Sequence, residues 1–348
     1  MFELWFGIVT LMLTLYVVLD GYDLGAGALH LAVARTDSER RAVLAAIGPF
    51  WDANEVWLIA AAGVLFSAFP RVFAAGLSGF YLGIFLIVWC LILRAVAVEF
   101  RSHLAEPLWR ALWDVTFAAS SALLVLLFGV MLGNVIRGMP LTPGGWFNLT
   151  LFTTFLPRDP VGILDWYTLL AGAFSGVALA GHGAAFLAWR SGGEVGERSR
   201  RFGLVLHVVL AALWPLTTLA THAVNPTLLP ALLGRPLAWA SIALAAGGLG
   251  WALRGGVRGE RLPTFLGSCA FLAGMLGATA ACLFPVMLRA LPDASRSITV
   301  YGGGATRHGL RTALGWWAIG FPIAAIYFAT LFRLHRAQSS APPNRDGY

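Results

Sequence analysis

Long apolar segments recur along the whole chain, and they limit what it can fold into more than any other feature. The 348 residues are 58% hydrophobic and only 12% charged, and their mean hydropathy is +0.76. A soluble domain could not keep that much apolar surface away from water. Because about 20 apolar residues cross a bilayer as a helix, the sequence predicts an all-α polytopic membrane protein.

We expect about nine transmembrane helices in helical bundles, with eight as the alternative, because the second segment is short and the seventh is rich in glycine. They form a single transmembrane domain over residues 1–336, which a polar, disordered tail follows over residues 337–348. The expected segments are 4–33, 55–69, 72–98, 113–136, 162–189, 202–223, 237–253, 265–288 and 310–334.

Arginine is the basic side chain throughout, and its placement predicts the orientation of the helices. The formal net charge is +7, but the arginines lie between apolar segments, so we expect membrane lipid rather than nucleic acid as a partner. Arginines are denser in the loops after the first, third, fifth and seventh segments. The positive-inside rule therefore places the N-terminus outside and the C-terminus in the cytoplasm. The loop 287–307 departs from this pattern, since it carries Arg289, Arg296 and Arg307 on the outer side.

The three cysteines, Cys90, Cys269 and Cys282, lie within apolar segments, and no CxxC motif is present. This arrangement argues against a disulfide framework, a thiolate metal site and covalently attached haem, so we expect no metal held by this chain. Glu3 stands where a signal peptide would carry positive charge, and the first segment is long. We therefore expect that segment to remain as a membrane helix.

An acidic motif stands at the start of the second segment, where an ordinary membrane helix would carry no charge. Asp52, Asn54 and Glu55 lie between Trp51 and Trp57. Asp52 and Glu55 are three residues apart and share a helix face. A carboxylate in such surroundings can relay protons, and Asn54 could extend a water chain. We prefer this function for Asp52 over a solvated helix end, whereas the tryptophans are better explained as interface anchors.

Asp20 and Asp23 form a second acidic pair, late in the first segment and again three residues apart. Gly21, Gly25 and Gly27 surround them and permit close helix packing. Because a charge that faces lipid is costly, these carboxylates should face protein or water and are further candidates for a proton pathway. The alternative is that they lie at a solvated helix end or pair with an arginine.

Arg94, Glu99 and Arg101 lie at the predicted cytoplasmic end of the third segment. We expect these charge partners to form a buried ion pair there, or Arg94 to reach Asp20 or Asp52. The alternative is an arginine that snorkels to the surface.

His182 is the histidine most clearly inside a segment, and it is the residue considered as a haem contact. A bis-His haem site needs two inward-facing histidines at matched depth, and His182 and His207 do not clearly match. His182 is equally well explained as a packed, hydrogen-bonded residue or as the neighbour of a haem held by another chain.

Several motifs, taken in order, resemble subunit II of the cytochrome bd-type quinol oxidases, including the cyanide-insensitive type. They are GYDLGAGAL from Gly21, GPFWDANEVWLI from Gly48, GLSGFYLGI from Gly76 and RAVAVEFR from Arg94. The similarity is dense over residues 20–113 and looser through Asn134, GHGAAFL and CLFPVML.

The resemblance implies a terminal oxidase that reduces O2 to water with electrons from quinol. It would be electrogenic without pumping protons, because it takes protons up from the cytoplasm. Haem b and haem d would be ligated by subunit I, the heterodimer partner, in the cytoplasmic membrane of a bacterium or archaeon. Subunit II would support haem assembly and supply acidic residues for proton uptake. Some members hold a structural quinone in it, and the complex can include small accessory subunits.

The family's WD pair falls on Trp51 and Asp52, and its DG[FY]D motif falls on residues 20–23. Its arginine and acid after the third segment fall on Arg94 and Glu99.

Two other functions remain open to a chain of this kind. A proton- or cation-coupled secondary transporter also uses intramembrane carboxylates, but the sequence has no clear pair of broken helices in inverted halves. A subunit that is purely a structural scaffold would differ from a proton-conducting subunit only in whether its acidic residues titrate during turnover.

Overall fold

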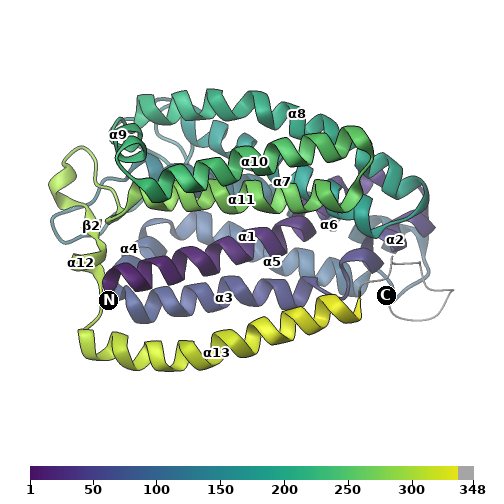
Figure 1. Cartoon of the computed structure of the whole chain (residues 1–348), viewed down its shortest axis with the longest axis horizontal. Coiled ribbons are helices and arrows are strands. Elements are labelled where there is room, and N and C mark those ends of the chain that lie inside the picture. Colours follow the sequence, from purple (N-terminus) through teal and green to yellow (C-terminus); the bar gives the residue numbers. More distant parts are fainter. Residues whose placement is uncertain (336–348) are drawn as a thin grey trace.

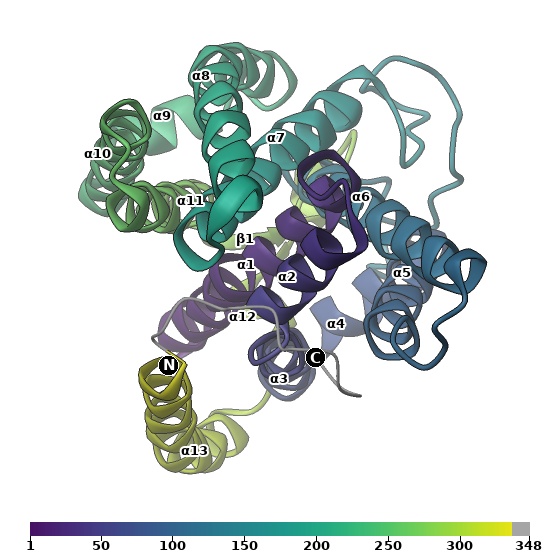
Figure 2. The same ribbon diagram turned by 90° about the vertical axis from the view of Figure 1, so that its right-hand side faces the viewer.

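Long helices run side by side through the molecule, and loops gather at one end of the bundle (Figures 1 and 2). The computed structural model describes residues 1–335, so the tail expected over residues 337–348 lies outside the described residues. We call the end at which α1 begins the amino end of the bundle, and the end at which α13 finishes the carboxyl end. The elements are α1 (Phe2–Val33), α2 (Asp37–Ile47), α3 (Trp51–Ala68), α4 (Pro70–Gly79), α5 (Tyr81–Phe100), α6 (Pro107–Arg137), α7 (Trp166–Arg190), α8 (Gly193–Val224), α9 (Leu228–Leu233), α10 (Pro236–Arg258), α11 (Arg261–Leu283), β1 (Val286–Leu288), η1 (Ala294–Arg296), β2 (Ile298–Thr299), α12 (Val300–Gly303) and α13 (Arg307–Leu334).

Eight helices of the described residues are long and apolar enough to cross a membrane: α1, α5, α6, α7, α8, α10, α11 and α13. The 18-residue α3 also runs from one end of the bundle to the other. Phe50, just before α3, stacks on Phe332 near the end of α13, with ring centroids 4.8 Å apart. At the other end, the Ala305 N–H, just before α13, donates to the Ala68 carbonyl (2.9 Å). The all-α polytopic architecture is confirmed, and the short second segment is one of the helices that run the length of the bundle.

Several expected segments have different limits in the structure; the segment 265–288, for example, ends as α11 at Leu283, and its last residues form β1. The segment 72–98 is divided into α4 and α5, because the chain leaves helical geometry at Phe80 (φ −96°, ψ 22°). Pro70 starts α4 just before this segment. The segment 162–189 begins later, at Trp166, because Asp165 caps α7. Its carboxylate accepts hydrogen bonds from the N–H groups of Tyr167 and Thr168, both 2.9 Å long.

Helix α1 occupies the middle of the bundle, where it packs against α3, α6, α7 and α11 (Figure 2). The expectation that its glycines allow close packing is confirmed at Gly25. A β-carbon there would lie 1.9 Å from the carbonyl oxygen of Leu179, and one at Gly183 would lie 2.2 Å from the nitrogen of Ala26. The backbones of α1 and α7 are therefore in direct contact, which fixes the depth at which the acidic pair of α1 lies.

The loops at the amino end are ordered by polar side chains of the helices they connect. Arg137, at the end of α6, forms an ion pair with Asp165 and donates to the Gly162 carbonyl (3.0 Å). Strands β1 and β2 form a short antiparallel hairpin in the loop between α11 and α13. These contacts hold the loops at the amino end in one arrangement relative to the helices.

Candidate functional site

A buried ion cluster joins three helices near the carboxyl half of the bundle. Arg94 of α5 is 1% exposed, and its Nη1 donates to Oδ1 of Asp20 on α1 (2.9 Å), which is 0% exposed. The second terminal nitrogen of Arg94 donates to Glu55 of α3, whose side chain is 22% exposed. Of the alternatives considered for Arg94, the structure selects the one in which it reaches Asp20. Two carboxylates thus share one guanidinium inside the membrane-spanning part of the chain.

Asp23 and Asn54 extend this cluster on the side of α1 and α3. The Asn54 amide nitrogen lies 2.7 Å from Oδ2 of Asp23, 2.8 Å from the Tyr22 hydroxyl and 3.1 Å from the Leu19 carbonyl. Both Asp23 and Asn54 are fully buried. We call Asp20, Asp23, Asn54, Glu55 and Arg94 together the Arg94 cluster. The sequence placed all five of them among the candidates, and the structure brings them together.

Several oxygens of the Arg94 cluster are buried without a hydrogen-bond partner in the described part of the chain. They are Oδ2 of Asp20, Oδ1 of Asp23 and Oδ1 of Asn54. Buried polar atoms are normally hydrogen-bonded, and a carboxylate oxygen without a protein donor is stabilised by a water or by a proton. The cluster therefore has acceptor sites that its own side chains do not fill.

The remaining members of the acidic motif in α3 lie outside the cluster. Asp52 is exposed in the first turn of α3, one turn before Glu55. Trp51 and Trp57 are buried, and the Trp57 ring lies against Phe328 of α13, with centroids 5.4 Å apart. Trp57 therefore packs α3 onto α13, which differs from its expected role as an interface anchor. Glu99 is exposed near the end of α5, so the structure does not bring it into the Arg94 cluster.

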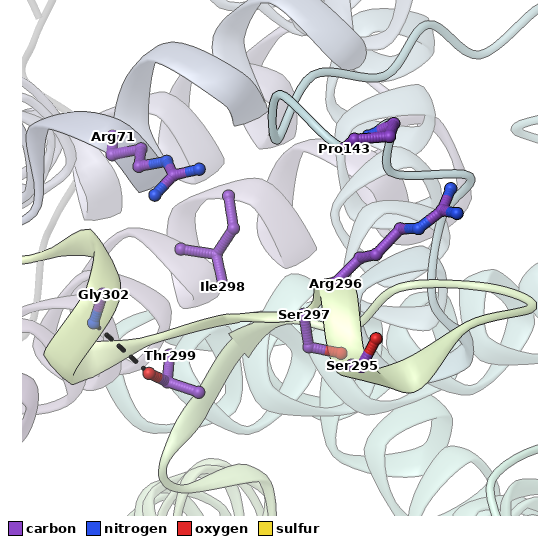
Figure 3. A pocket seen from close by; sticks show the side chains of 8 residues that line it. All are labelled: Arg71, Pro143, Ser295, Arg296, Ser297, Ile298, Thr299 and Gly302. Atoms are coloured by element: carbon purple, nitrogen blue, oxygen red, sulfur yellow. Dashed lines mark hydrogen bonds between the residues drawn. The ribbon is translucent and has the colours of Figure 1, made fainter.

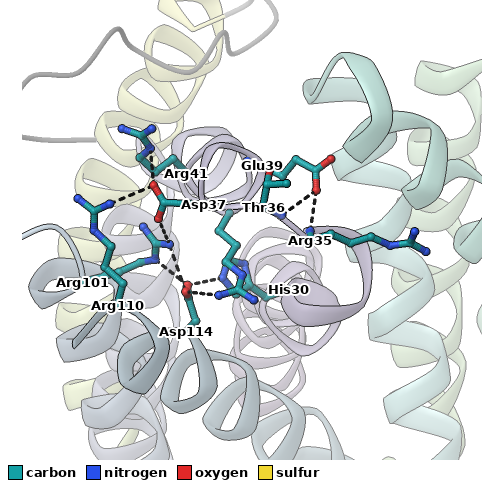
Figure 4. A network of polar contacts seen from close by, with 10 residues as sticks. His30, Arg35, Thr36, Asp37, Glu39, Arg41, Arg101, Arg110 and Asp114 are labelled. Atoms are coloured by element: carbon teal, nitrogen blue, oxygen red, sulfur yellow. Dashed lines mark hydrogen bonds and ion pairs between the residues drawn. The ribbon is translucent and has the colours of Figure 1, made fainter. Parts of the chain in front are cut away.

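Arg101 belongs to a second polar network, at the carboxyl end of the bundle (Figure 4). Its Nε and Nη2 donate to the two oxygens of Asp114, at 2.6 and 3.1 Å. Asp114 also accepts from His30 Nε2 (2.7 Å) and from Arg40 Nη1 (3.0 Å). Asp37 accepts from Arg101 (2.8 Å). Burial alone would lower the pKa of Arg101, but its hydrogen bonds to Asp114 raise that pKa above the ordinary value.

We call His30, Asp37, Arg40, Arg101 and Asp114 the Asp114 network. Sequence reasoning named only Arg101 of these residues as part of a site. The sequence signal that could have identified Asp114 is an acid in the first turn of an apolar segment. Asp114 directly follows Trp113, where the fourth expected segment begins. Helices α1, α2, α6 and the end of α5 are joined through this one carboxylate.

His182 is a packed, hydrogen-bonded residue in the structure. Its Nε2 donates to the Val18 carbonyl (2.9 Å), and its Nδ1 lies 2.7 Å from the Ser268 hydroxyl. Its ring stacks on Phe265, with centroids 5.2 Å apart. Both ring nitrogens are engaged within the protein, so the geometry of His182 does not fit an axial haem ligand. Within residues 1–335, no group of three or more His, Cys, Asp or Glu side chains is arranged to hold a metal ion.

Comparison with known proteins finds a family model that covers nearly the whole chain. The model, described as cytochrome bd terminal oxidase subunit II, matches residues 1–335. Cytochrome bd-I ubiquinol oxidase subunit 2 of Escherichia coli (strain K12) is 34% identical over 231 residues, which are 65% of this chain and 60% of that protein. Cytochrome bd ubiquinol oxidase subunit 2 of Bacillus subtilis (strain 168) is 32% identical over 214 residues, which are 60% of this chain and 61% of that protein. The chain thus matches about three-fifths of the length of these curated relatives.

A solved structure shares the fold over almost the entire length. A chain from the structure of bd oxidase from Geobacillus thermodenitrificans superposes with a TM-score of 0.72 and 17% sequence identity. The superposition covers 96% of this chain and 98% of that one.

Proposed function

The chain belongs to the cytochrome bd terminal oxidase subunit II family, and on this premise we propose that it serves a quinol:O2 oxidoreductase as the subunit that admits protons. Its partner in a heterodimer would be subunit I, which would ligate haem b and haem d and oxidise the quinol. The complex would reside in the cytoplasmic membrane of a bacterium, with the carboxyl end of the bundle facing the cytoplasm. Because the proposed role of this chain lies in proton movement and assembly, no electron-transfer step is assigned to its residues.

The observation that carries this proposal is a gradient of exposure along three carboxyl groups. Asp52 is exposed in the first turn of α3, Glu55 is 22% exposed one turn further, and Asp20 is 0% exposed. Arg94 holds the last two in contact through its two terminal nitrogens. Exposed, half-buried and buried acids in succession are the arrangement that a proton needs to leave water and enter a protein interior.

Each residue of the Arg94 cluster has a part in this proposal. Asp52 collects a proton at the predicted cytoplasmic surface, and Glu55 receives it. Arg94 neutralises part of the negative charge of the buried acids, so that they can be retained inside the membrane. Asp20 and Asp23 then offer the unfilled oxygens at which a proton or a water can bind, and Asn54 orients Asp23.

The test compares carboxyl variants in the purified complex reconstituted into liposomes. We expect Asp52→Asn, Glu55→Gln and Asp20→Asn each to slow quinol-driven O2 consumption and proton uptake, by roughly ten-fold or more for the buried acid. The haem spectrum must be unchanged, so that a loss of turnover is not a loss of assembly. Glu194→Gln is the matched control, because Glu194 is 81% exposed at the same end of the bundle.

A different outcome would assign this chain a purely structural role. If all three variants assemble the haems and retain full turnover and proton uptake, the acids do not titrate during turnover. The chain would then act as a scaffold for its partner, and the proton route would have to lie elsewhere.

A further inference from the structure

A pocket of about 410 Å³ lies at the amino end of the bundle, away from both polar clusters. Three separate segments form it: the start of α4, the loop between α6 and α7, and the hairpin that contains η1 and β2 (Figure 3). It is within the size range of small-ligand sites. Its lining residues are Arg71, Pro143, Ser295, Arg296, Ser297, Ile298, Thr299 and Gly302.

The two charged side chains that line this pocket are both arginines. Arg71 has no carboxylate within ion-pair distance among residues 1–335, while Arg296 has a surface pair with Asp293 (3.2 Å) in which both side chains are 45% exposed. An exposed pair of that kind is weak and leaves most of the guanidinium donors available. The pocket therefore presents an excess of positive charge.

The loop beside Arg71 and the helix that carries it both shape the pocket, and the helix adds to the positive potential. Gly145 has φ +82°, a backbone conformation that favours glycine, and the position of a β-carbon there would lie 3.0 Å from a guanidinium nitrogen of Arg71, so the loop passes directly beside the arginine. Arg71 also lies in the first turn of α4, which contains no acidic residue and no side-chain cap. A cation at the positive end of a helix is unfavourable, and an anion bound there would offset it.

Two hydroxyl groups of the lining also retain a hydrogen that they can donate to a ligand. Ser297 Oγ accepts from the Ala290 N–H (3.0 Å), and Thr299 Oγ1 accepts from the Gly302 N–H (3.3 Å). Because each oxygen acts as an acceptor in these bonds, each retains its own hydrogen for another partner. Guanidinium and hydroxyl donors together are the usual partners of a phosphate group.

The surroundings place this pocket beside the hydrocarbon surface. Phe66 near the end of α3 and Phe73 of α4 form an edge-to-face pair, with centroids 5.5 Å apart, next to the turn that carries Arg71, and Phe66 is exposed. Trp146 is also exposed on the neighbouring loop. Exposed aromatic side chains beside basic residues are typical of the level of the lipid headgroups.

We propose that this pocket binds a phosphate group, and that its source is the headgroup of a phospholipid in the adjacent leaflet. The proposal also accounts for one of the arginines that depart from the positive-inside pattern in the loop 287–307. Another of them, Arg289, donates to the carbonyl of Arg137 (2.9 Å) and so has a partner inside the protein. Arg296 instead turns toward the pocket together with Arg71.

The experiment uses the complete oxidase complex with Arg71→Gln and Arg296→Gln combined. After delipidation, the complex is titrated with phosphatidylglycerol in detergent micelles and bound lipid is counted by native mass spectrometry. Since each surface arginine adds about 1 kcal/mol to the attraction for an anionic lipid, we expect the double variant to bind one phospholipid roughly 30-fold more weakly than wild type. Arg158→Gln, an exposed arginine of the same outer end, is the matched control and should bind like wild type.

A second titration with inorganic phosphate distinguishes the two sources of the ligand. If phosphate alone raises the unfolding temperature of wild type but not of the double variant, the site binds free phosphate and the pocket chemistry is confirmed. The combined Arg71→Lys and Arg296→Lys variant, which retains the charge, should recover most of the binding and controls for misfolding. The proposal is overturned if the double glutamine variant keeps wild-type binding of both probes. It is also overturned if that variant weakens association with the partner subunit while its lipid and phosphate binding are unchanged.

Discussion

The two polar clusters of this chain differ in the balance between acids and bases, and this difference separates their roles. The Arg94 cluster holds three carboxyl groups and one guanidinium, which contacts two of them, and oxygens of Asp20 and Asp23 lack partners in the described part of the chain. In the Asp114 network, both oxygens of one carboxylate accept hydrogen bonds from three side chains. An excess of carboxyl groups can take up protons, whereas a saturated carboxylate surrounded by bases is suited to holding helices together.

The largest effect should follow from removing the single cation of the Arg94 cluster. Arg94→Gln leaves the buried Asp20 and the half-buried Glu55 without a counter-charge, and breaking a buried ion pair in this way costs about 3–5 kcal/mol. We expect little assembled complex, measured as the yield of haem-containing heterodimer from the membrane.

A compensated variant sharpens that prediction. Arg94→Gln combined with Asp20→Asn and Glu55→Gln removes all three charges and should restore assembly, but not turnover. Wild-type yield from the single variant Arg94→Gln would show that these carboxyl groups are neutral without the arginine and need no counter-charge.

A smaller effect, of a different kind, is expected at the other cluster. Asp114→Asn removes the charge that Arg101, Arg40 and His30 share, and should lower the stability of the complex by about 2–3 kcal/mol. Turnover per assembled complex should stay close to wild type, because every carboxylate oxygen of this network has a hydrogen-bond partner. A thermal unfolding curve and an oxygen-electrode assay on the same preparation provide both measurements. Unchanged stability with slowed turnover would reverse the roles assigned to the two clusters.

The smallest effect concerns the surface contact between α2 and α8. The hydrogen bond from Arg198 lowers the pKa of Glu39 below its ordinary value of 4.5. A carboxyl group with a lowered pKa stabilises the folded state above its unfolded pKa, and this contribution is lost as the pH falls through the folded pKa. Glu39→Gln should therefore reduce stability by roughly 0.2–1 kcal/mol at neutral pH, with the difference from wild type disappearing in acid. Unfolding temperatures measured from pH 7 down to pH 3 would test this, and a difference that grows in acid would contradict it.

Much of the fold was predictable because a helix that crosses a bilayer needs apolar residues within its own segment, whatever its neighbours are. A run of apolar residues is recognised without knowing its neighbours, and this was sufficient for the expected segments that became α1, α6, α8 and α11. Where the prediction was wrong, the backbone at a single residue decided the outcome. The chain leaves helical geometry at Phe80 inside the expected third segment, and Asp165 delays the start of α7.

The site was predictable in part for the same reason. A carboxylate or a guanidinium in an apolar segment is conspicuous in the sequence, which is how Asp20, Asp23, Glu55 and Arg94 were found. Asp114 was missed, because an acid in the first turn of a segment has the same pattern as a solvated helix end. Asp52 was singled out by its motif, but its exposure and the burial of Glu55 one turn later could not be read from the order of the residues.

The sequence by itself determined which side chains must be partnered inside this protein, because hydropathy and charge are properties of each segment. Only the tertiary structure decided which partner each one has. Arg94 and Asp20 are separated by 74 residues, and they meet because α1 packs near α5 at a depth set by the backbone contact with α7. The pocket at the amino end has the same origin, since Arg71 and Arg296 lie far apart in the chain and line one pocket together. Electrostatic interactions depend on distance in space, and the distance is a property of the packed helices rather than of any one segment.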